Sequence, residues 1–223
     1  MMTKKVLRLL LCAGLLSFGG AAAQAAAAGT ALDAELHKVE LNWEHVKFQE
    51  DGQPQQFDDM AAIAKQAAAI AARYPGRAEP LIWQGIATSE EAGLASMLHA
   101  MSYAKEARAL LEQADSMDPS ALDAGAPTCL GVLYYRVPGF PVGFGDTDKA
   151  RQMLKQAVSL APDGMDANYF YADFLMNEKD YATAEKVLRH ALALPPRPDR
   201  PLWDQNRRGV MRALLAKAQA HTS

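Results

Sequence analysis

Cysteine and histidine are the residues of this sequence most able to act as nucleophiles, bases or metal ligands, and neither type forms a recognisable site. Cys129 falls on a predicted helix, and the neighbouring sequence offers neither the histidine partner nor the positive environment that a catalytic thiolate requires. The five histidines include no pair at the spacing that binds zinc, and no nucleophile motif or phosphate-binding loop occurs. We therefore interpret Cys129 as a small core residue and predict no enzyme activity, metal or cofactor.

Arginine is the remaining residue type whose position is informative. Arg136 can hold a carboxylate through two parallel hydrogen bonds, or it can pair with Asp173 or Glu90. A second basic group lies near the C-terminus. It either binds acidic partners or phosphates, or it forms the solvent-facing side of a capping helix, which is the interpretation that the sequence favours. Its members are Arg197, Arg200, Arg207, Arg208 and Arg212.

A repeated sequence pattern predicts the helices that position these residues. The positions Ala150, Leu154, Ala157 and Pro162 recur 34 residues later as Ala184, Leu188, Ala191 and Pro196. The same spacing occurs once more at Ala107, Leu111, Ala114 and Pro119. Small residues allow two antiparallel helices to approach closely, and proline ends the second of them. One such hairpin cannot bury its own apolar face, so hairpins stack on one another.

Apolar spacing and Gly/Pro breakers predict an all-α fold, a solenoid of about four helical hairpins with a C-terminal capping helix. Helices are expected at 32–48, 57–74, 79–91, 127–136, 166–177, 181–194 and 203–220. A further helix carries the Ala107 group, after an extended helical connection at 92–103, and another follows Asp146, which caps it.

These features resemble the tetratricopeptide repeat (TPR) family over residues 78–196, where Leu130, Gly131 and Tyr134 match its L-G-x-x-Y pattern. The resemblance implies a non-catalytic scaffold whose first helices line a concave groove, with Arg136 as the only cation in it. The groove residues it implies are Ile82, Ile86, Glu90, Val132, Tyr135, Arg136, Tyr169, Asp173 and Asn177.

The Pro/Gly-rich segment 137–145 carries two phenylalanines, Phe140 and Phe144, that are costly to leave in water. They either form a lid over the groove or tuck into the core between hairpins. The segment is similar to an insertion in the T component of TRAP-type (tripartite, periplasmic) transporters. That similarity implies a periplasmic helper that binds a partner or a small hydrophobic ligand.

The first 25 residues read as a secretory signal peptide, with Lys4, Lys5 and Arg8 before an apolar run and small residues around Ala25. Cleavage there leaves one domain, residues 26–223, in the periplasm. Members of the T-component family are lipoproteins, whereas Leu11 is too large for the position before a lipidated Cys12.

The net charge of the chain limits the classes of partner that we expect it to bind. The whole chain has a formal charge of −3, and loss of the signal peptide makes it more acidic, which disfavours nucleic acid. No later stretch is apolar enough to span a membrane. We expect a protein or peptide partner, or a small hydrophobic or carboxylate ligand, on the concave face; the alternative is a small-ligand accessory of a TRAP-type transporter.

Overall fold

The computed structural model describes residues 19–222, with side chains from residue 29 onward except that of Met97. Most of the expected signal peptide, residues 1–25, therefore lies outside the described residues. Within residues 19–222 every regular element is an α-helix, and an isolated bridge joins Gly139 to Gly145 in the loop after α5. The helices are α1 (Gly19–Gln49), α2 (Gln53–Arg73), α3 (Glu79–Leu94), α4 (Met97–Met117), α5 (Ala121–Arg136), α6 (Thr147–Leu160), α7 (Met165–Asn177), α8 (Tyr181–Ala193) and α9 (Pro201–Thr222). None of these helices is long and apolar enough to cross a membrane.

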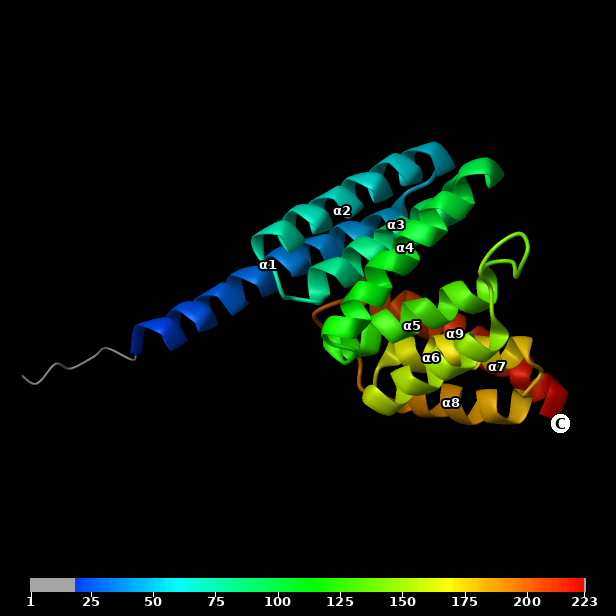
Figure 1. Cartoon of the computed structure of the whole chain (residues 1–223). Coiled ribbons are helices and arrows are strands. Elements are labelled where there is room, and N and C mark those ends of the chain that lie inside the picture. The colour runs from blue at the N-terminus through cyan, green and yellow to red at the C-terminus, as the bar shows by residue number, and fades with distance from the viewer. Residues whose placement is uncertain (1–18, 223) are drawn as a thin grey trace, which may run out of the picture.

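Consecutive helices pair as hairpins, and the hairpins stack side by side (Figure 1). The pairs are α1 with α2, α3 with α4, α5 with α6 and α7 with α8, while α9 packs against α8. The predicted all-α solenoid of four hairpins and a C-terminal capping helix is confirmed.

The repeated small and leucine positions form the contacts inside the hairpins. All nine of them are completely buried: Ala107, Leu111, Ala114, Ala150, Leu154, Ala157, Ala184, Leu188 and Ala191. Glycines lie opposite two of the leucines. A Cβ added at Gly85 of α3 would lie 2.7 Å from Cγ of Leu111, and one added at Gly131 of α5 would lie 2.5 Å from Cγ of Leu154. The leucine of the second helix therefore packs directly on the backbone of the first.

One connection differs from the sequence-based expectation, and one helix begins irregularly. The connection expected at 92–103 is a two-residue link between α3 and α4, and the extra residues lengthen α4 to 21 residues, against 14 in α6. In α5, Leu122, Asp123 and Ala124 adopt left-handed backbone angles with φ of 51–59°. Such angles are unfavourable for residues with a Cβ, so the regular right-handed helix begins only after this turn, close to the predicted start at 127.

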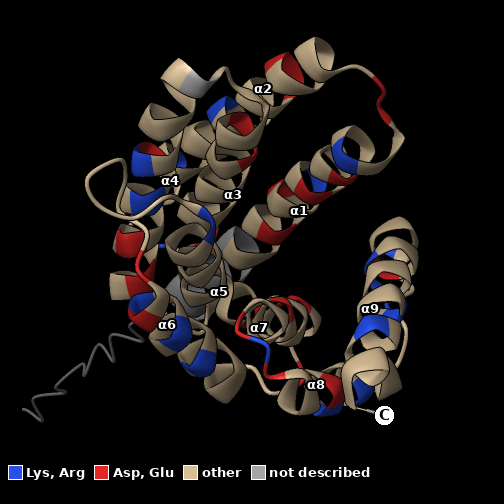
Figure 2. Ribbon diagram, turned by 90° about the vertical axis from the view of Figure 1, so that its right-hand side faces the viewer, with Lys and Arg blue, Asp and Glu red and all other residues tan. Residues whose placement is uncertain are grey.

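The stack curves so far that its two ends meet. Helix α9 returns to the side of α1 and contacts it (Figure 2). Trp43 of α1, Trp83 of α3 and Trp203 of α9 belong to one buried apolar cluster. The concave side of the solenoid is therefore bounded at both ends rather than open.

Candidate ligand-binding site

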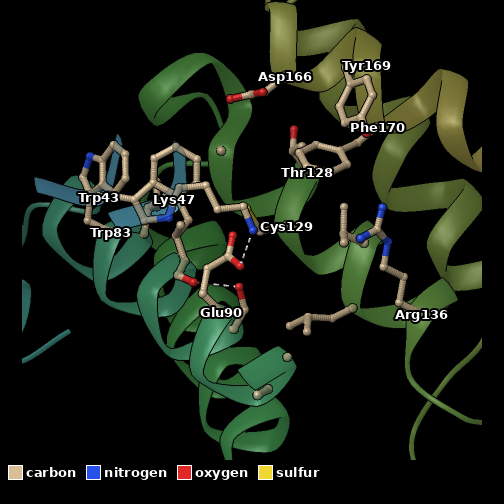
Figure 3. Close-up of a pocket in the computed structure, with 18 of the residues that line it drawn as sticks. Trp43, Lys47, Trp83, Glu90, Thr128, Cys129, Arg136, Asp166, Tyr169 and Phe170 are labelled. Carbon is tan, nitrogen blue, oxygen red and sulfur yellow. Dashed lines mark hydrogen bonds and ion pairs between the residues drawn. The ribbon is translucent and has the colours of Figure 1, made fainter. Parts of the chain in front are cut away.

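A cavity of about 710 Å³ occupies the concave side, within the range of small-molecule sites. Its wall contains residues of α1, α3, α4, α5, α7 and α9, so both ends of the chain contribute to it. Figure 3 shows Trp43 and Trp83 on one side of the cavity, with Tyr169 and Phe170 across from them.

Aromatic residues form much of this wall. Its members include all three tryptophans of the chain, Trp43, Trp83 and Trp203, which are 6%, 5% and 3% exposed. The ring centroids of Trp43 and Trp83 are 6.0 Å apart. Among the described residues, none of the three indole N–H groups has a hydrogen-bond acceptor. These three N–H groups are sealed from solvent, and an unpaired buried donor costs about 1–3 kcal/mol, so the tryptophans offer the cavity apolar ring surface.

Four cations line the cavity, and each is paired with an acid. The ion pairs are Lys47–Glu90 at 2.7 Å, Arg136–Asp173 at 2.8 Å, Arg200–Glu44 at 2.5 Å and Arg207–Asp166 at 2.6 Å. The expectation that Arg136 would be the only cation in the groove is wrong. Lys47, Arg200 and Arg207 come from the two ends of the solenoid, which meet only because the stack closes on itself.

Of the five C-terminal arginines, Arg212 and half-exposed Arg197 face solvent as the sequence suggested, whereas Arg200, Arg207 and Arg208 are largely buried. Arg200 and Arg207 have side chains that are 10% and 12% exposed. Arg207 lies 4.3 Å above the ring of Tyr169, and Arg200 lies 4.7 Å above the ring of Trp203. The reason is the helical spacing of α9, which places Trp203 and Arg207 on the face that lines the cavity, with Arg200 directly before the helix on the same side.

Arg208 has a structural role on another face of α9. Its guanidinium donates to Asp204 and to the backbone carbonyls of Leu192, Leu194 and Pro195. These bonds satisfy carbonyls at the end of α8 and hold α9 against it.

The groove residues implied by the resemblance divide into two groups. Six of the nine line the cavity: Ile82, Ile86, Glu90, Val132, Arg136 and Tyr169. The others, Tyr135, Asp173 and Asn177, are not part of its wall. The Tyr135 hydroxyl donates to the Asp173 carboxylate, and burial together with this carboxylate raises the pKa of Tyr135. Arg136 donates to both Asp173 and the Tyr135 oxygen, so the pairing with Asp173, one of its two expected roles, is present.

The two phenylalanines of the 137–145 loop lie outside the cavity wall. Phe140 is 93% exposed, while Phe144 packs edge-on against Tyr134, with ring centroids 5.9 Å apart, beneath Arg108. Only Val137 and Pro138 of this loop belong to the wall. The loop ends at Asp146, whose side chain accepts hydrogen bonds from the amides of Asp148 and Lys149 and caps α6 as predicted.

Cys129 also lines the cavity, next to the acids Asp166 and Glu90. Burial, followed by the charge of these two carboxylates, raises the pKa of its thiol to about 12. The thiol therefore stays protonated near neutral pH and is a poor nucleophile. The site is chemically suited to binding through aromatic surface and hydrogen bonds.

Sequence reasoning missed the contribution of α1 and α9 to this site. The residues it missed are Trp43, Lys47, Arg200, Trp203 and Arg207. The spacing of Arg200, Trp203 and Arg207 is the one signal that could have indicated a second functional face on α9, but the sequence alone does not show what that face meets.

Comparisons with known proteins agree with this architecture. Residues 142–218 match the model of the tetratricopeptide repeat family. The chain is similar in structure to a thermophilic TPR protein of Thermus thermophilus, with a TM-score of 0.55 and 19% sequence identity over 87% of this chain and 95% of that one. Among curated proteins, none matches the chain significantly. The family match covers residues 142–218, and the structural likeness shows that the chain shares the stacked-hairpin fold of that TPR protein.

Proposed function

We propose that the protein is an exported, non-catalytic binding protein that holds a small ligand in the cavity enclosed by its hairpins. The observation that carries this proposal is the buried ion pair between Glu44 of α1 and Arg200 at the start of α9, which turns the concave face into a bounded cavity of about 710 Å³. Stacked helical repeats generally use this face for recognition. A cavity of this volume suits a small molecule, whereas a long extended peptide needs a groove that is open at both ends.

The wall supports binding rather than turnover. Its aromatic rings supply apolar contact area, and its ion pairs fix the orientation of polar groups around the ligand. The residues that line the cavity include no histidine to activate a nucleophile, and the Cys129 thiol is protonated at neutral pH. Affinity would thus come from the tryptophans, with specificity from the arginines.

A second candidate is a more specific version of the first, namely a small-ligand accessory of a TRAP-type transporter in the periplasm. Two observations favour it: helices from both ends of the chain wall the cavity, and the Pro/Gly-rich loop after α5 begins at the cavity wall with Val137 and Pro138. Because Phe140 at the tip of this loop is 93% exposed, the loop is available to contact another component of a transporter.

The test is native mass spectrometry of the chain from residue 26 onward, purified from a bacterial periplasm. We expect a discrete added mass that disappears on denaturation. Val132 lines the cavity, so Val132→Phe should fill it and abolish the added mass. Val142 is 69% exposed on the outer loop, and Val142→Phe is the matched control that should retain the added mass.

Tryptophan fluorescence provides an independent measurement, because all three tryptophans of the chain line the cavity. Ligand binding should therefore change the emission of the wild-type protein and of Val142→Phe, but not of Val132→Phe. The proposal fails if the periplasmic protein carries no added mass and its fluorescence responds to no member of a small-molecule panel.

A further inference from the structure

We infer that the cavity selects ligands that carry a carboxylate, and that Arg207 of α9 is the residue that binds it. The inference rests on the proposed function, since it names the class of ligand for the same cavity. It assigns to a residue near the C-terminus a role that the sequence left open for Arg136.

Arg207 is held in a fixed orientation inside the wall. Its Nε lies 2.6 Å from Oδ1 of Asp166, and its guanidinium lies 4.3 Å above the ring of Tyr169 and 5.1 Å above that of Phe170. Its side chain is only 12% exposed. The conformational entropy that a flexible arginine loses on binding has therefore been lost already in the folded protein.

The ion pair with Asp166 leaves the two terminal nitrogens of the Arg207 guanidinium available to a ligand. A guanidinium carries five N–H donors, and the ionic contact with Asp166 lies at Nε, whose N–H makes no hydrogen bond. The two terminal nitrogens of Arg207 have no acceptor among the described residues, yet they are not sealed from solvent as Nε is. Two parallel N–H groups on the terminal nitrogens match the two oxygens of a carboxylate.

The other cations of the wall are less suited to this role. Lys47 is a point charge that already donates to Glu90 at 2.7 Å. Arg136 uses Nη2 for Asp173 and Nε for Tyr135, and its side chain is 53% exposed, where water weakens charge-assisted bonds. Arg200 forms the buried pair that joins α9 to α1, so its charge is committed to Glu44.

The charge pairs of the wall leave donors of Arg207 available to an acceptor on the ligand. The carboxylates of Glu90 and Asp166 are occupied by Lys47 and Arg207, and Asp123 is 3.6 Å from Arg197 at the surface. The terminal nitrogens of Arg207 are unpaired donors that solvent reaches, whereas the three indole N–H groups, Nε of Arg207 and Oδ1 of Asp166 are sealed from solvent and have no hydrogen-bond partner. A ligand that brings oxygen acceptors matches this wall better than an amine does.

The rest of the ligand has an apolar surface beside the charge. Trp203 precedes Arg207 by one helical turn, and Val210 follows it by one turn on the same face of α9. A carboxylate held by Arg207 therefore places an attached ring or alkyl chain against an indole. The predicted ligand is a monocarboxylate with an aromatic or aliphatic body.

Three probes of the same shape test the inference: 4-phenylbutanoate, 4-phenylbutan-1-ol and 4-phenylbutylamine. Binding to the chain from residue 26 onward is measured by tryptophan fluorescence and by calorimetry. We expect the carboxylate to bind at least about ten-fold more tightly than the alcohol or the amine. In Arg207→Met, which keeps the aliphatic stem, this preference should fall below about three-fold while the affinity for the alcohol stays unchanged.

Arg136→Met is the matched control, because it removes a second cavity arginine and should retain the ten-fold preference. Circular dichroism checks that each variant remains folded. If the alcohol or the amine binds as tightly as the carboxylate, or if Arg207→Met retains the preference, the inference is wrong although the cavity still binds ligands. If no probe binds and native mass spectrometry also finds no added mass, the proposed function itself is wrong.

Discussion

Glu44 and Arg200 are 156 residues apart in the sequence, yet Nε of Arg200 donates to Oε1 of Glu44 across 2.5 Å. The two side chains are 3% and 10% exposed. This pair joins the first hairpin to the segment that leads into the capping helix, between Trp83 and Trp203, whose rings lie 6.0 Å and 4.7 Å from the Arg200 guanidinium. Solenoids usually cover each terminal repeat with a polar cap, whereas here each end covers the other.

Removing the acid from this pair should strongly destabilise the protein. Glu44→Gln leaves the Arg200 charge buried without a counter-charge, and we expect a loss of about 3 kcal/mol in the free energy of unfolding, measured with urea. Replacing both residues, as Glu44→Gln with Arg200→Met, should recover part of this loss because no unpaired charge remains.

An exposed ion pair provides the control for this experiment. Arg189 pairs with Glu185 on α8 at 2.7 Å, and its side chain is 58% exposed. Arg189→Ala should change the free energy of unfolding by less than about 1 kcal/mol. Equal effects of Glu44→Gln and Arg189→Ala would show that the ends of the solenoid are not held together by the buried pair.

Gly131→Ala should separate the helices of the third hairpin. The added Cβ would lie 2.5 Å from Cγ of Leu154, which is completely buried and has no room to move. We expect a loss of about 1–3 kcal/mol in thermal or urea unfolding. Gly209 of α9 is open to solvent, with nothing within 4 Å of an added Cβ, so Gly209→Ala should instead stabilise the protein by up to about 1 kcal/mol.

Glu91 should make the stability depend on pH. Burial, together with the nearby Glu106, raises the pKa of its carboxyl from 4.5 to about 7. The unfolded chain ionises this group near pH 4.5, so the folded protein should lose stability as the pH rises from about 4.5 to 7, with little further change above that range. Glu91→Gln should leave stability at pH 4 nearly unchanged and raise it at pH 8, by about 1–2 kcal/mol after allowing for screening. A parallel shift of the variant at both pH values would contradict this assignment.

Cys129 should react slowly with alkylating agents. A thiol whose pKa is raised to about 12 is almost entirely protonated at pH 8, so alkylation by iodoacetamide should be at least about 100-fold slower in the folded protein than in urea. Val142→Cys in a Cys129→Ala background places a thiol on the exposed loop, and it should react at the rate of a free thiol. Rapid alkylation of native Cys129 would indicate that the cavity opens readily.

The local architecture could be predicted because it depends on short-range pattern. The repeated positions represented by Leu111, Leu154 and Leu188 are all buried, and the glycines at 85 and 131 lie against the first two of these leucines. These contacts connect neighbouring helices, and the 34-residue repeat shows the sequence positions at which they occur.

The closure of the stack could not be predicted in this way. Each hairpin is rotated slightly relative to the one before it, and the total rotation over the stack decides whether Arg200 contacts Glu44. The sequence of a single repeat does not determine that total rotation. For the same reason, register within a repeat identified Arg136 and Tyr169 as cavity residues but could not place Arg207 beside them.

The contact between α1 and α9 can form only after most of the chain has been synthesised. The N-terminal helix emerges first from the ribosome, but Trp43 cannot be fully covered until residues 200–203 have been made, at the other end of the chain. Each inner hairpin can form as soon as its own residues appear, while this last contact must wait for nearly the entire sequence. A chain that is truncated before Pro201 would therefore retain its hairpins but present an aromatic surface to chaperones and proteases, which gives the cell a simple means of recognising an unfinished molecule.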